Sequence, residues 1–339
     1  MNLEGESTVQ LHEGPRVSVC VPTYNRSSYL RQAMDSVLKQ TFGDFELLVV
    51  DNASTDDTAT VVSGYRNPRV RYHCNESNLG MVGNWNKCLE LARGEFIAIL
   101  HDDDLWLPRF LEHMVAALDS NPEAGFAYCP CYFVDEVGTH IGEASRTFST
   151  DCYIESRTLF GMLVQRSGGF SNPGVLVRRR CYAAVGLYDD TLIQCADWDM
   201  WLRLSFRFDA AYIAEPLTCY RMHTNSISKK QASYPILVVQ DSLRTIEKAL
   251  ELITPSDKTL RDKARREVAG WRMQLAWQYR LGGRRRDALR ATWDAVRVWP
   301  ATALRPMTGP LSLLMSMLLP GRVLQSIRHA GRLAQERGL

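Results

Sequence analysis

Short apolar runs that alternate with helical segments constrain the fold of this chain more than any other feature. Residues 17–21, 45–50 and 96–100 are apolar runs of strand length, and a weaker candidate lies at 70–72. Helical segments lie between and after these runs: from Ser27 or Ser28 to Leu38, from Thr55 or Asp56 to about Tyr65, from 78–80 to Ala92 with Gly94 as its C-cap, and from Pro108 onward. Strands and helices at this spacing predict right-handed parallel crossovers and a doubly wound α/β sheet.

Polar clusters follow three of the predicted strands. Residues 23–26 follow the first strand, Asp51 and Asn52 follow the second, and residues 102–104 follow the fourth. In sheets of this type the ligand binds outside the carboxyl ends of the strands, so the clusters predict a ligand site at that edge. The first strand is not followed by a Gly-x-Gly-x-x-Gly sequence or a P-loop, so a nucleotide would be held by other means.

Three adjacent carboxylates make up the last of these clusters: Asp102, Asp103 and Asp104. Neighbouring carboxylates repel one another unless a cation lies among them, and oxygen ligands suit Mg²⁺ or Mn²⁺. The alternative is a solvated acidic turn. The position directly after a buried strand favours the metal site.

The pattern changes after Asn121. Strand candidates lie at 126–128, 132–135, 174–177, 212–214 and 218–220, and residues 195–204 have the pattern of a loop entering an amphipathic helix. Residues 236–252, 260–281 and 284–298 have helical periodicity. We therefore expect a flexible arm at residues 1–14, a main domain at 15–228 and a helical, basic region at 229–339.

Charge is distributed unevenly along the 339 residues, although the net charge is only +2. From Asp257 to the end there are 17 Lys and Arg against 6 Asp and Glu, and the remainder has 23 against 32. A basic C-terminal region predicts an anionic partner such as a membrane surface, and the alternative is a helical cap with a solvated basic face. Nucleic acid is not expected, because no recognised binding module accompanies the charge.

The chain shows no signal of secretion or of membrane insertion. Residues 1–14 have no apolar segment, and the longest apolar run of the C-terminal region, 311–319, is well short of the roughly 20 residues of a membrane span. The nine cysteines have neither a disulfide framework nor zinc-site spacing, which predicts reduced thiols in a cytoplasmic protein.

Six sequence blocks carry recognisable motifs: residues 17–26, 49–56, 78–84 (Asn78, Leu79, Gly80 and Asn84), 102–104, 196–199 and 220–223. Together they resemble the family 2 glycosyltransferases, which are inverting enzymes of the GT-A fold. The resemblance spans roughly residues 15–228 and lacks the Gln-x-x-Arg-Trp block of the processive members. It implies a GT-A mixed sheet flanked by helices, followed here by a C-terminal helical extension.

The resemblance assigns most of these blocks to the nucleotide-sugar donor. Asp51 would bind the ribose, since a carboxylate accepts several hydrogen bonds, although it could instead cap a helix. The segment from Asn78 to Asn84 would flank the nucleotide, although its residues could merely cap the next helix. The donor-binding residues implied in this way are Pro22, Thr23, Tyr24, Asn25, Arg26, Asp51, Asn78, Gly80, Asn84, Asp102 and Arg221.

The acidic triplet corresponds to the family's Asp-x-Asp signature, which holds a divalent ion on the donor diphosphate. Asp103, Asp104 and His223 are the implied ligands of an Mn²⁺ or Mg²⁺ ion, and His223 could instead be an ordinary core or surface histidine. His101 stands where many relatives have the first aspartate of Asp-x-Asp-Asp. This departure leaves open which carboxylates face the ion.

An inverting transfer needs a base that deprotonates the acceptor hydroxyl. By resemblance this catalytic base is Asp197, and Ala196 stands where the family often has Glu. The alternative is that Asp197 only caps the helix that follows. Asp199 is expected to point elsewhere once that helix has begun.

Together these features predict a metal-dependent inverting glycosyltransferase. It would move one sugar from a nucleoside-diphosphate donor, UDP by default, to a hydroxyl of a saccharide or lipid-linked acceptor in polysaccharide or glycolipid assembly. The predicted location is the cytoplasm, with peripheral attachment to the inner face of the plasma membrane. The alternatives are a metal-dependent nucleotidyltransferase and a catalytically inactive nucleotide-sugar-binding module on a membrane.

Overall fold

The computed structural model describes residues 14–166, 172–224, 226, 235–304, 310 and 313. Residues 1–13 of the predicted arm and most of the basic region beyond residue 304 lie outside this range. The chain forms two compact units, which are discontinuous in sequence. The first contains Met1–Leu159, Gly169–Tyr188 and Arg207–Met222, and the second contains Phe160–Gly168, Asp189–Phe206 and His223–Leu339. The single domain boundary at residue 228 stays a prediction.

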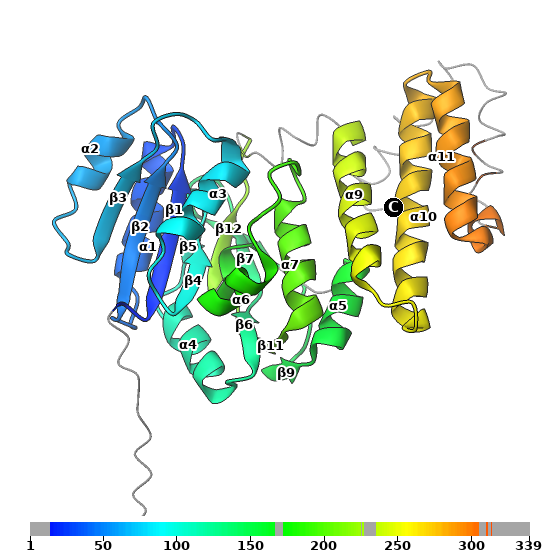
Figure 1. Cartoon of the computed structure of the whole chain (residues 1–339). Helices are drawn as coiled ribbons and strands as arrows, with labels where there is room; N and C mark the ends of the chain where they lie inside the picture. Colours follow the sequence, from blue (N-terminus) through cyan, green and yellow to red (C-terminus); the bar gives the residue numbers. More distant parts are fainter. Residues whose placement is uncertain are drawn as a thin grey trace, which may run out of the picture. The chain divides into compact units, whose positions relative to one another are not determined.

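An eight-stranded mixed sheet forms the centre of the first unit (Figure 1). Its strand order is β3-β2-β1-β4-β10-β6-β11-β9. The first four strands are parallel, β10 is antiparallel to both neighbours, and β9 is antiparallel to β11. The strands are β1 (Val17–Thr23), β2 (Phe45–Asp51), β3 (Val70–Cys74), β4 (Phe96–Ile99), β6 (Ala124–Tyr128), β9 (Cys152–Ile154), β10 (Val175–Arg178) and β11 (Asp209–Tyr212).

The expectation of a mixed sheet flanked by helices is confirmed. The doubly wound arrangement inferred from spacing holds for the first four strands only. An apolar run does not reveal the direction of its strand, so the antiparallel β10 could not be recognised from residues 174–177.

A four-stranded sheet beside it follows the order β5-β12-β7-β8. Its first strand, β5 (Leu105–Trp106), comes directly after the acidic triplet and pairs antiparallel with β12 (Thr218–Arg221). This pairing fixes the C-terminal side of the acidic loop. The other two strands are β7 (Cys131–Val134) and β8 (His140–Glu143).

Helices cover both faces of the large sheet. On one face, α1 (Ser27–Leu38) and α4 (Phe110–Ser120) bury apolar side chains against alternate residues of β1, β2 and β4 in one core cluster. The other face carries α3 (Gly80–Leu91) and α6 (Arg179–Val185), which border a groove that reaches Ile97. The remaining short elements of this unit are α2 (Thr58–Ser63), the 3₁₀ turn η1 (Asn172–Gly174) and the start of α5 (Ser156–Val164).

The predicted span of α1 is confirmed, but its serine cap, the start of α2 and the C-cap of α3 were predicted wrongly. No side chain of Ser27 or Ser28 caps α1; the Asp56 carboxylate accepts the Ser27 N–H at 3.0 Å instead. Helix α2 begins at Thr58, whose N–H donates to the other oxygen of Asp56 at 3.1 Å. The C-cap of α3 is Ala92, and Gly94 is required for another reason: a Cβ there would lie 2.5 Å from the backbone nitrogen of Ser18.

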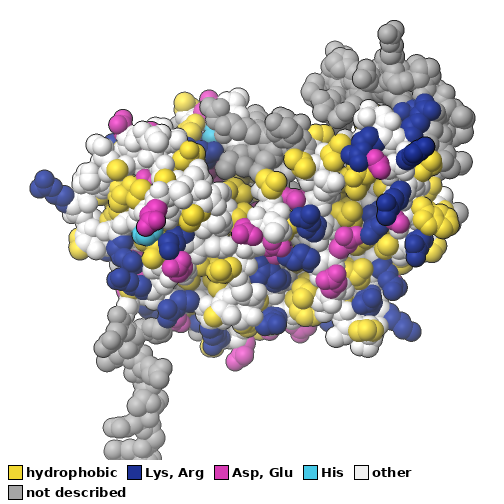
Figure 2. All heavy atoms as spheres, turned by 45° about the horizontal axis from the view of Figure 1, so that its top comes forward, with side chains coloured by type: hydrophobic (Ala, Val, Ile, Leu, Met, Phe, Trp, Pro, Cys, Tyr) yellow, Lys and Arg dark blue, Asp and Glu magenta, His cyan; other side chains and the backbone are white. Residues whose placement is uncertain are grey.

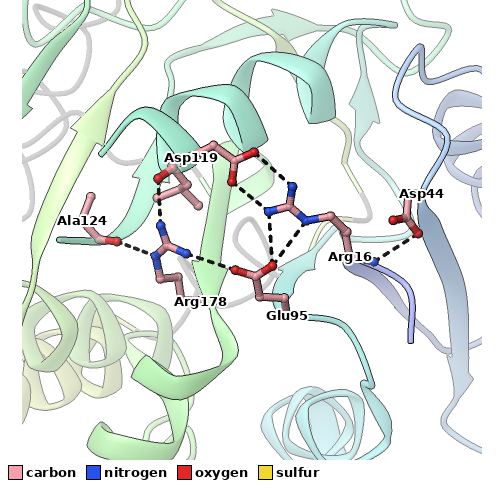
Figure 3. A network of polar contacts seen from close by, with 7 residues as sticks. Arg16, Asp44, Glu95, Asp119, Ala124 and Arg178 are labelled. Carbon is pink, nitrogen blue, oxygen red and sulfur yellow. Dashed lines mark hydrogen bonds and ion pairs between the residues drawn. The ribbon is translucent and has the colours of Figure 1, made fainter. Parts of the chain in front are cut away.

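An ion-pair network lies at the end of the sheet where β1 and β4 begin (Figure 3). Arg16 pairs with Glu95 and with Asp119 of α4, at 3.2 and 2.8 Å, and Arg178 of β10 pairs with Glu95 at 3.2 Å. Arg178 also donates to two backbone carbonyls, of Ala124 and Leu118. The network joins β4, β10 and α4 at the edge where β1 and β4 start, away from the clusters that follow their carboxyl ends.

The second unit is helical. Its helices are α7 (Ala196–Arg207), α9 (Pro235–Leu252), α10 (Lys258–Leu281) and α11 (Arg285–Val298), and α11 is followed by the 3₁₀ turn η2 (Pro300–Leu304). The helices α9, α10 and α11 confirm the prediction made from the helical periodicity of the sequence. Alanines of α11 pack on α10, where Ala291 and Ala295 cluster with Ala269, Met273 and Ala276. Among the described residues, no helix combines the length and apolar character needed to cross a membrane.

Candidate active site

The register of the parallel strands brings the polar clusters to one edge of the sheet. Thr23 lies opposite Asp51, and β4 runs beside β1 so that Cys20 lies opposite Ile99. The chain leaves β4 next to the end of β1, and the Thr23 hydroxyl donates to an oxygen of Asp102 at 2.8 Å. Residues far apart in sequence therefore meet where parallel strands place a ligand.

Asp51 lies at the end of β2 and is almost completely buried. Its carboxylate accepts the Ser54 N–H at 2.9 Å and the Tyr72 hydroxyl at 2.6 Å. Burial and the bond to Asp51 raise the pKa of Tyr72. Since the first residue of α2 is Thr58, Asp51 does not cap that helix. A carboxylate has acceptor positions beyond these two, so it remains suited to a ribose hydroxyl.

The loops after β1 and β2 are bonded to each other through Asn25. This residue has a φ of 52°, in the left-handed region that asparagine tolerates better than most residues. Its backbone N–H donates to the Ser54 hydroxyl at 2.9 Å, and its side-chain oxygen accepts the Thr55 N–H at 2.7 Å. Pro22 is part of β1 itself, opposite Val50. The Tyr24 side chain, by contrast, is exposed.

A cluster of asparagine side chains forms the β2–β3 side of the edge. Asn52 donates to Asn78 and to the Gly80 carbonyl, at 2.9 and 3.0 Å. Asn75 donates to Asn52 and to Asn84, which itself donates to the Val50 carbonyl at 2.9 Å. The Asn84 amide is thus buried within the fold. Gly80 has a φ of 76° and no atom within 4 Å of where its Cβ would be, so the backbone is open to close approach there.

Two arginines hold the acidic loop. Arg26 bonds Asp102 at 3.1 Å and Asp103 at 2.7 Å from one guanidinium nitrogen. The buried Arg221 donates its backbone N–H to Asp104 at 2.9 Å and its Nε–H to the Asp103 carbonyl at 2.8 Å. The rest of its guanidinium bonds the Glu136 carbonyl and the Gln32 side chain. Arg221 therefore fixes the shape of the loop from within the protein.

Burial and mutual repulsion disfavour the ionised forms of the Asp102 and Asp104 carboxyl groups. Burial, followed by the Asp103 charge, raises the pKa of Asp102 to about 6, although Arg26 and Thr23 act against the shift. Burial and the Asp103 charge also raise the pKa of Asp104. A cation bound here would remove part of this repulsion.

The described residues contain one cluster whose ligand atoms suit a metal ion. Atoms of His101, Asp103 and Asp104 lie within 4.8 Å of one another. Within the described structure, Oδ2 of Asp104 is buried and has no hydrogen-bond partner. A buried carboxylate oxygen normally has a partner, so this oxygen fits the donor set of a divalent ion.

Two predicted site residues, Asp197 and His223, belong to the second unit. Asp197 lies in the first turn of α7, where its carboxylate accepts the Trp198 N–H at 2.7 Å. His223 is buried. The roles of both residues stay predictions. Asp199 points away from the helix start as expected, and bonds Arg203 at 2.8 Å and Lys248 of α9 at 2.6 Å.

Sequence reasoning did not identify Tyr72, Asn75 or His101 as parts of this edge. Tyr72 lies in a short strand that gave only a weak signal, and Asn75 follows it directly. The signal that was overlooked is the position of Asn75, which follows a strand just as Asp51 and Asn52 do. His101 stands out in the sequence only as a departure from the family pattern.

The sequence profile of glycosyl transferase family 2 matches residues 18–182. The chain is 31% identical over 233 residues to an uncharacterized glycosyltransferase of Methanocaldococcus jannaschii, covering 65% of this chain and 77% of that protein. It is also 31% identical over 232 residues to an uncharacterized protein of Mycobacterium tuberculosis, covering 62% of this chain and 68% of the relative.

Solved glycosyltransferase structures share the fold. The S. aureus TarS fragment 1–349 in complex with UDP-GlcNAc superposes with a TM-score of 0.65 at 18% identity, covering 86% of each chain. The mannosyltransferase PcManGT of Pyrobaculum calidifontis, in complex with GDP-Man and Mn²⁺, gives 0.56 at 19% identity, over 93% of this chain and 84% of that one. These structures show the fold, and the sequence matches establish that the chain belongs to glycosyl transferase family 2.

Proposed function

We propose that this glycosyltransferase moves a single sugar from a nucleoside-diphosphate donor to an acceptor hydroxyl, with inversion and with the help of a divalent ion. One observation carries the proposal: the buried Asp51, the Thr23–Asp102 bond and the cluster of His101, Asp103 and Asp104 share the carboxyl edge of one sheet. Such an edge offers hydrogen-bond acceptors for a ribose beside ligands for the ion of a diphosphate.

Donor recognition would be divided among the loops. Asp51 accepts hydroxyl groups of the ribose, Tyr24 and Asn25 flank the base, and the open backbone at Gly80 lets the nucleotide approach closely. We propose UDP as the nucleotide of the donor, since TarS was solved with UDP-GlcNAc. Pro22, Asn78 and Asn84 act by shaping the loops that surround the nucleotide.

The acidic loop would receive the diphosphate. Asp103 and Asp104 would hold a divalent ion, which when bound would offset the negative charge of the leaving nucleoside diphosphate. Arg26 lies beside both Asp102 and Asp103 and keeps their orientation. His223 is the further ligand that the resemblance implies, and Arg221 acts by holding the loop.

Asp197 would serve as the catalytic base. Its carboxylate takes the proton of the acceptor hydroxyl while the acceptor oxygen bonds to the anomeric carbon. The bond between that carbon and the diphosphate oxygen breaks on the opposite face, which inverts the configuration. The acceptor of the proposal is a saccharide or a lipid-linked saccharide in polysaccharide or glycolipid assembly.

A panel of nucleotide sugars tests the proposal. Incubation of the full chain with UDP-, GDP- and dTDP-sugars and Mn²⁺ should release nucleoside diphosphate from one of them, and Asp103→Ala should lose this release. Pyrophosphate formed from a nucleoside triphosphate and a sugar phosphate would identify a nucleotidyltransferase instead. Binding of a nucleotide sugar without any turnover, in the presence of candidate acceptors, would favour the inactive binding module.

We also propose that helix α11 meets an anionic membrane surface. Its exposed stripe consists of Arg286, Leu289, Arg290, Trp293 and Arg297, and Trp293 is 65% exposed. The acidic residues of α11 pair instead with Arg284 and Arg272. Basic side chains gather over α10 and α11 in Figure 2. Arginines are attracted to the negative charge of anionic lipids, and an exposed tryptophan favours the interface between lipid and water.

Vesicle sedimentation tests this contact. The full chain should sediment with phosphatidylglycerol vesicles and not with phosphatidylcholine vesicles. Arg290→Glu should weaken binding several-fold, since each arginine near such a surface contributes about 1 kcal/mol. The matched control Arg109→Glu, an exposed arginine of the first unit, should bind like the parent. Equal binding by all three proteins would contradict the assignment to α11.

A further inference from the structure

His101 occupies a fixed position at the start of the acidic loop. Its ring stacks on Trp85 of α3 with centroids 5.2 Å apart and an interplanar angle of 17°. Tyr188 contacts the same tryptophan edge-on at 5.4 Å. The Asn86 side chain bonds both backbone groups of Tyr188 at 2.9 Å. The stack therefore restricts the imidazole plane before any ligand binds.

The stacked imidazole points a nitrogen toward the unpartnered carboxylate oxygen. Nδ1 of His101 lies 3.8 Å from Oδ2 of Asp104, the buried oxygen without a hydrogen-bond partner among the described residues. This separation is too long for a hydrogen bond. Two atoms that each lie about 2.1 Å from one ion are separated by about 3.0 to 3.6 Å. A small movement would place both atoms on a common ion.

The other parts of the cluster are already held in place. The second oxygen of Asp104 accepts the Arg221 N–H at 2.9 Å, which turns Oδ2 toward His101. Asp103, whose ligand atom completes the group, is bonded by Arg26 at 2.7 Å. The three side chains thus offer one nitrogen and two carboxylates to a single position.

We propose that His101 is a ligand of the divalent ion and that it makes the site selective for Mn²⁺ over Mg²⁺. The inference rests on the ion site of the proposed function and specifies its donor set. Mg²⁺ favours oxygen ligands and retains its water, whereas a nitrogen ligand strengthens binding of first-row transition ions. A site with aspartate at this position would lack that preference.

Metal binding measured directly, without turnover, tests the proposal. The electron paramagnetic resonance signal of free Mn²⁺ is titrated with the full chain, and Mg²⁺ affinity is obtained by competition. The parent should bind Mn²⁺ more tightly than Mg²⁺. His101→Asn should weaken Mn²⁺ binding about tenfold and change Mg²⁺ binding less than twofold. His101→Asp should retain an ion but lose most of the preference for Mn²⁺.

A control and a second readout distinguish the alternatives. His140→Asn, at an exposed position of β8, should bind both ions like the parent, and circular dichroism confirms folding of each variant. Unchanged Mn²⁺ affinity in His101→Asn, or an equal loss for both ions, would overturn the proposal. If the parent binds neither ion, the ion site itself is wrong. Calorimetry with UDP in the absence of metal then shows whether the donor site of the proposed function survives.

Discussion

Replacing Arg221 by methionine should destabilise the first unit and the acidic loop together. The side chain is 2% exposed, so solvent screening does not weaken its interactions. Its guanidinium donates to the Asp103 carbonyl at 2.8 Å, the Glu136 carbonyl at 2.8 Å and the Gln32 side chain at 2.9 Å. Methionine fills a similar volume but satisfies none of these acceptors.

The expected loss follows from the acceptors left without donors. Each buried acceptor left without a donor costs about 1–3 kcal/mol, and the substitution leaves three such acceptors. We therefore expect Arg221→Met to lower the free energy of unfolding by about 4 kcal/mol. Arg221→Lys should lose about half as much, because an ammonium cannot reach acceptors in three directions at once.

Urea unfolding followed by tryptophan fluorescence measures this loss, with UDP binding as a second readout. Arg109→Met, which removes an exposed arginine that pairs with Glu112, is the control and should change stability by less than about 0.5 kcal/mol. A loss below about 1 kcal/mol in Arg221→Met would refute the structural role. If UDP binding fell without a loss of stability, Arg221 would act on the phosphates, as the family resemblance implied.

Three further predictions concern the base, the second unit and acid stability. Asp197→Asn should abolish transfer while UDP still binds in calorimetry, and an active variant would exclude Asp197 as the base. Lys248→Met should lower stability by about 2 kcal/mol, because it removes an ion pair with the buried Asp199. The loss is no larger because Asp199 retains Arg203 and the lysine is partly exposed. An unchanged urea midpoint would contradict this. Burial alone would raise the pKa of Glu46, but bonds from Ser18 and Arg71 outweigh it and lower that pKa. The stability that Glu46 contributes is present above the ordinary glutamate pKa and is lost as the pH falls through the pKa of Glu46 in the folded protein. The difference in melting temperature between the parent and Glu46→Gln should therefore shrink from about pH 7 to about pH 4.

The sequence predicted the edge of the sheet that carries the polar clusters. Each of these strands carries its polar residues at the carboxyl end. Because parallel strands have their carboxyl ends at the same edge of the sheet, parallel pairing alone brings Thr23, Asp51 and Asp102 together. The GT-A fold followed from the order of the blocks. The antiparallel β10 was not predictable, because its apolar run would look the same in either direction.

Tertiary contacts decided the roles that sequence left open. Nothing local to residues 220–223 shows that Arg221 is enclosed and bonds the Asp103 carbonyl, because its partners come from distant segments. The stack of His101 on Trp85 likewise joins a loop to a helix that precedes it by several residues. A family resemblance predicts a role for a residue at a given position. Only the structure shows which contacts the side chain of that residue makes within the protein.

Calorimetric titration of the full chain with UDP, with Mn²⁺ and again with the metal chelated, tests the central claim most directly. The account predicts saturable binding with Mn²⁺ that weakens at least tenfold on chelation and again when Asp51→Asn removes the carboxylate at the end of β2. Binding of equal strength in all three experiments, or no binding of UDP, GDP or dTDP under any of them, would contradict a metal-assisted nucleotide-sugar site at this edge.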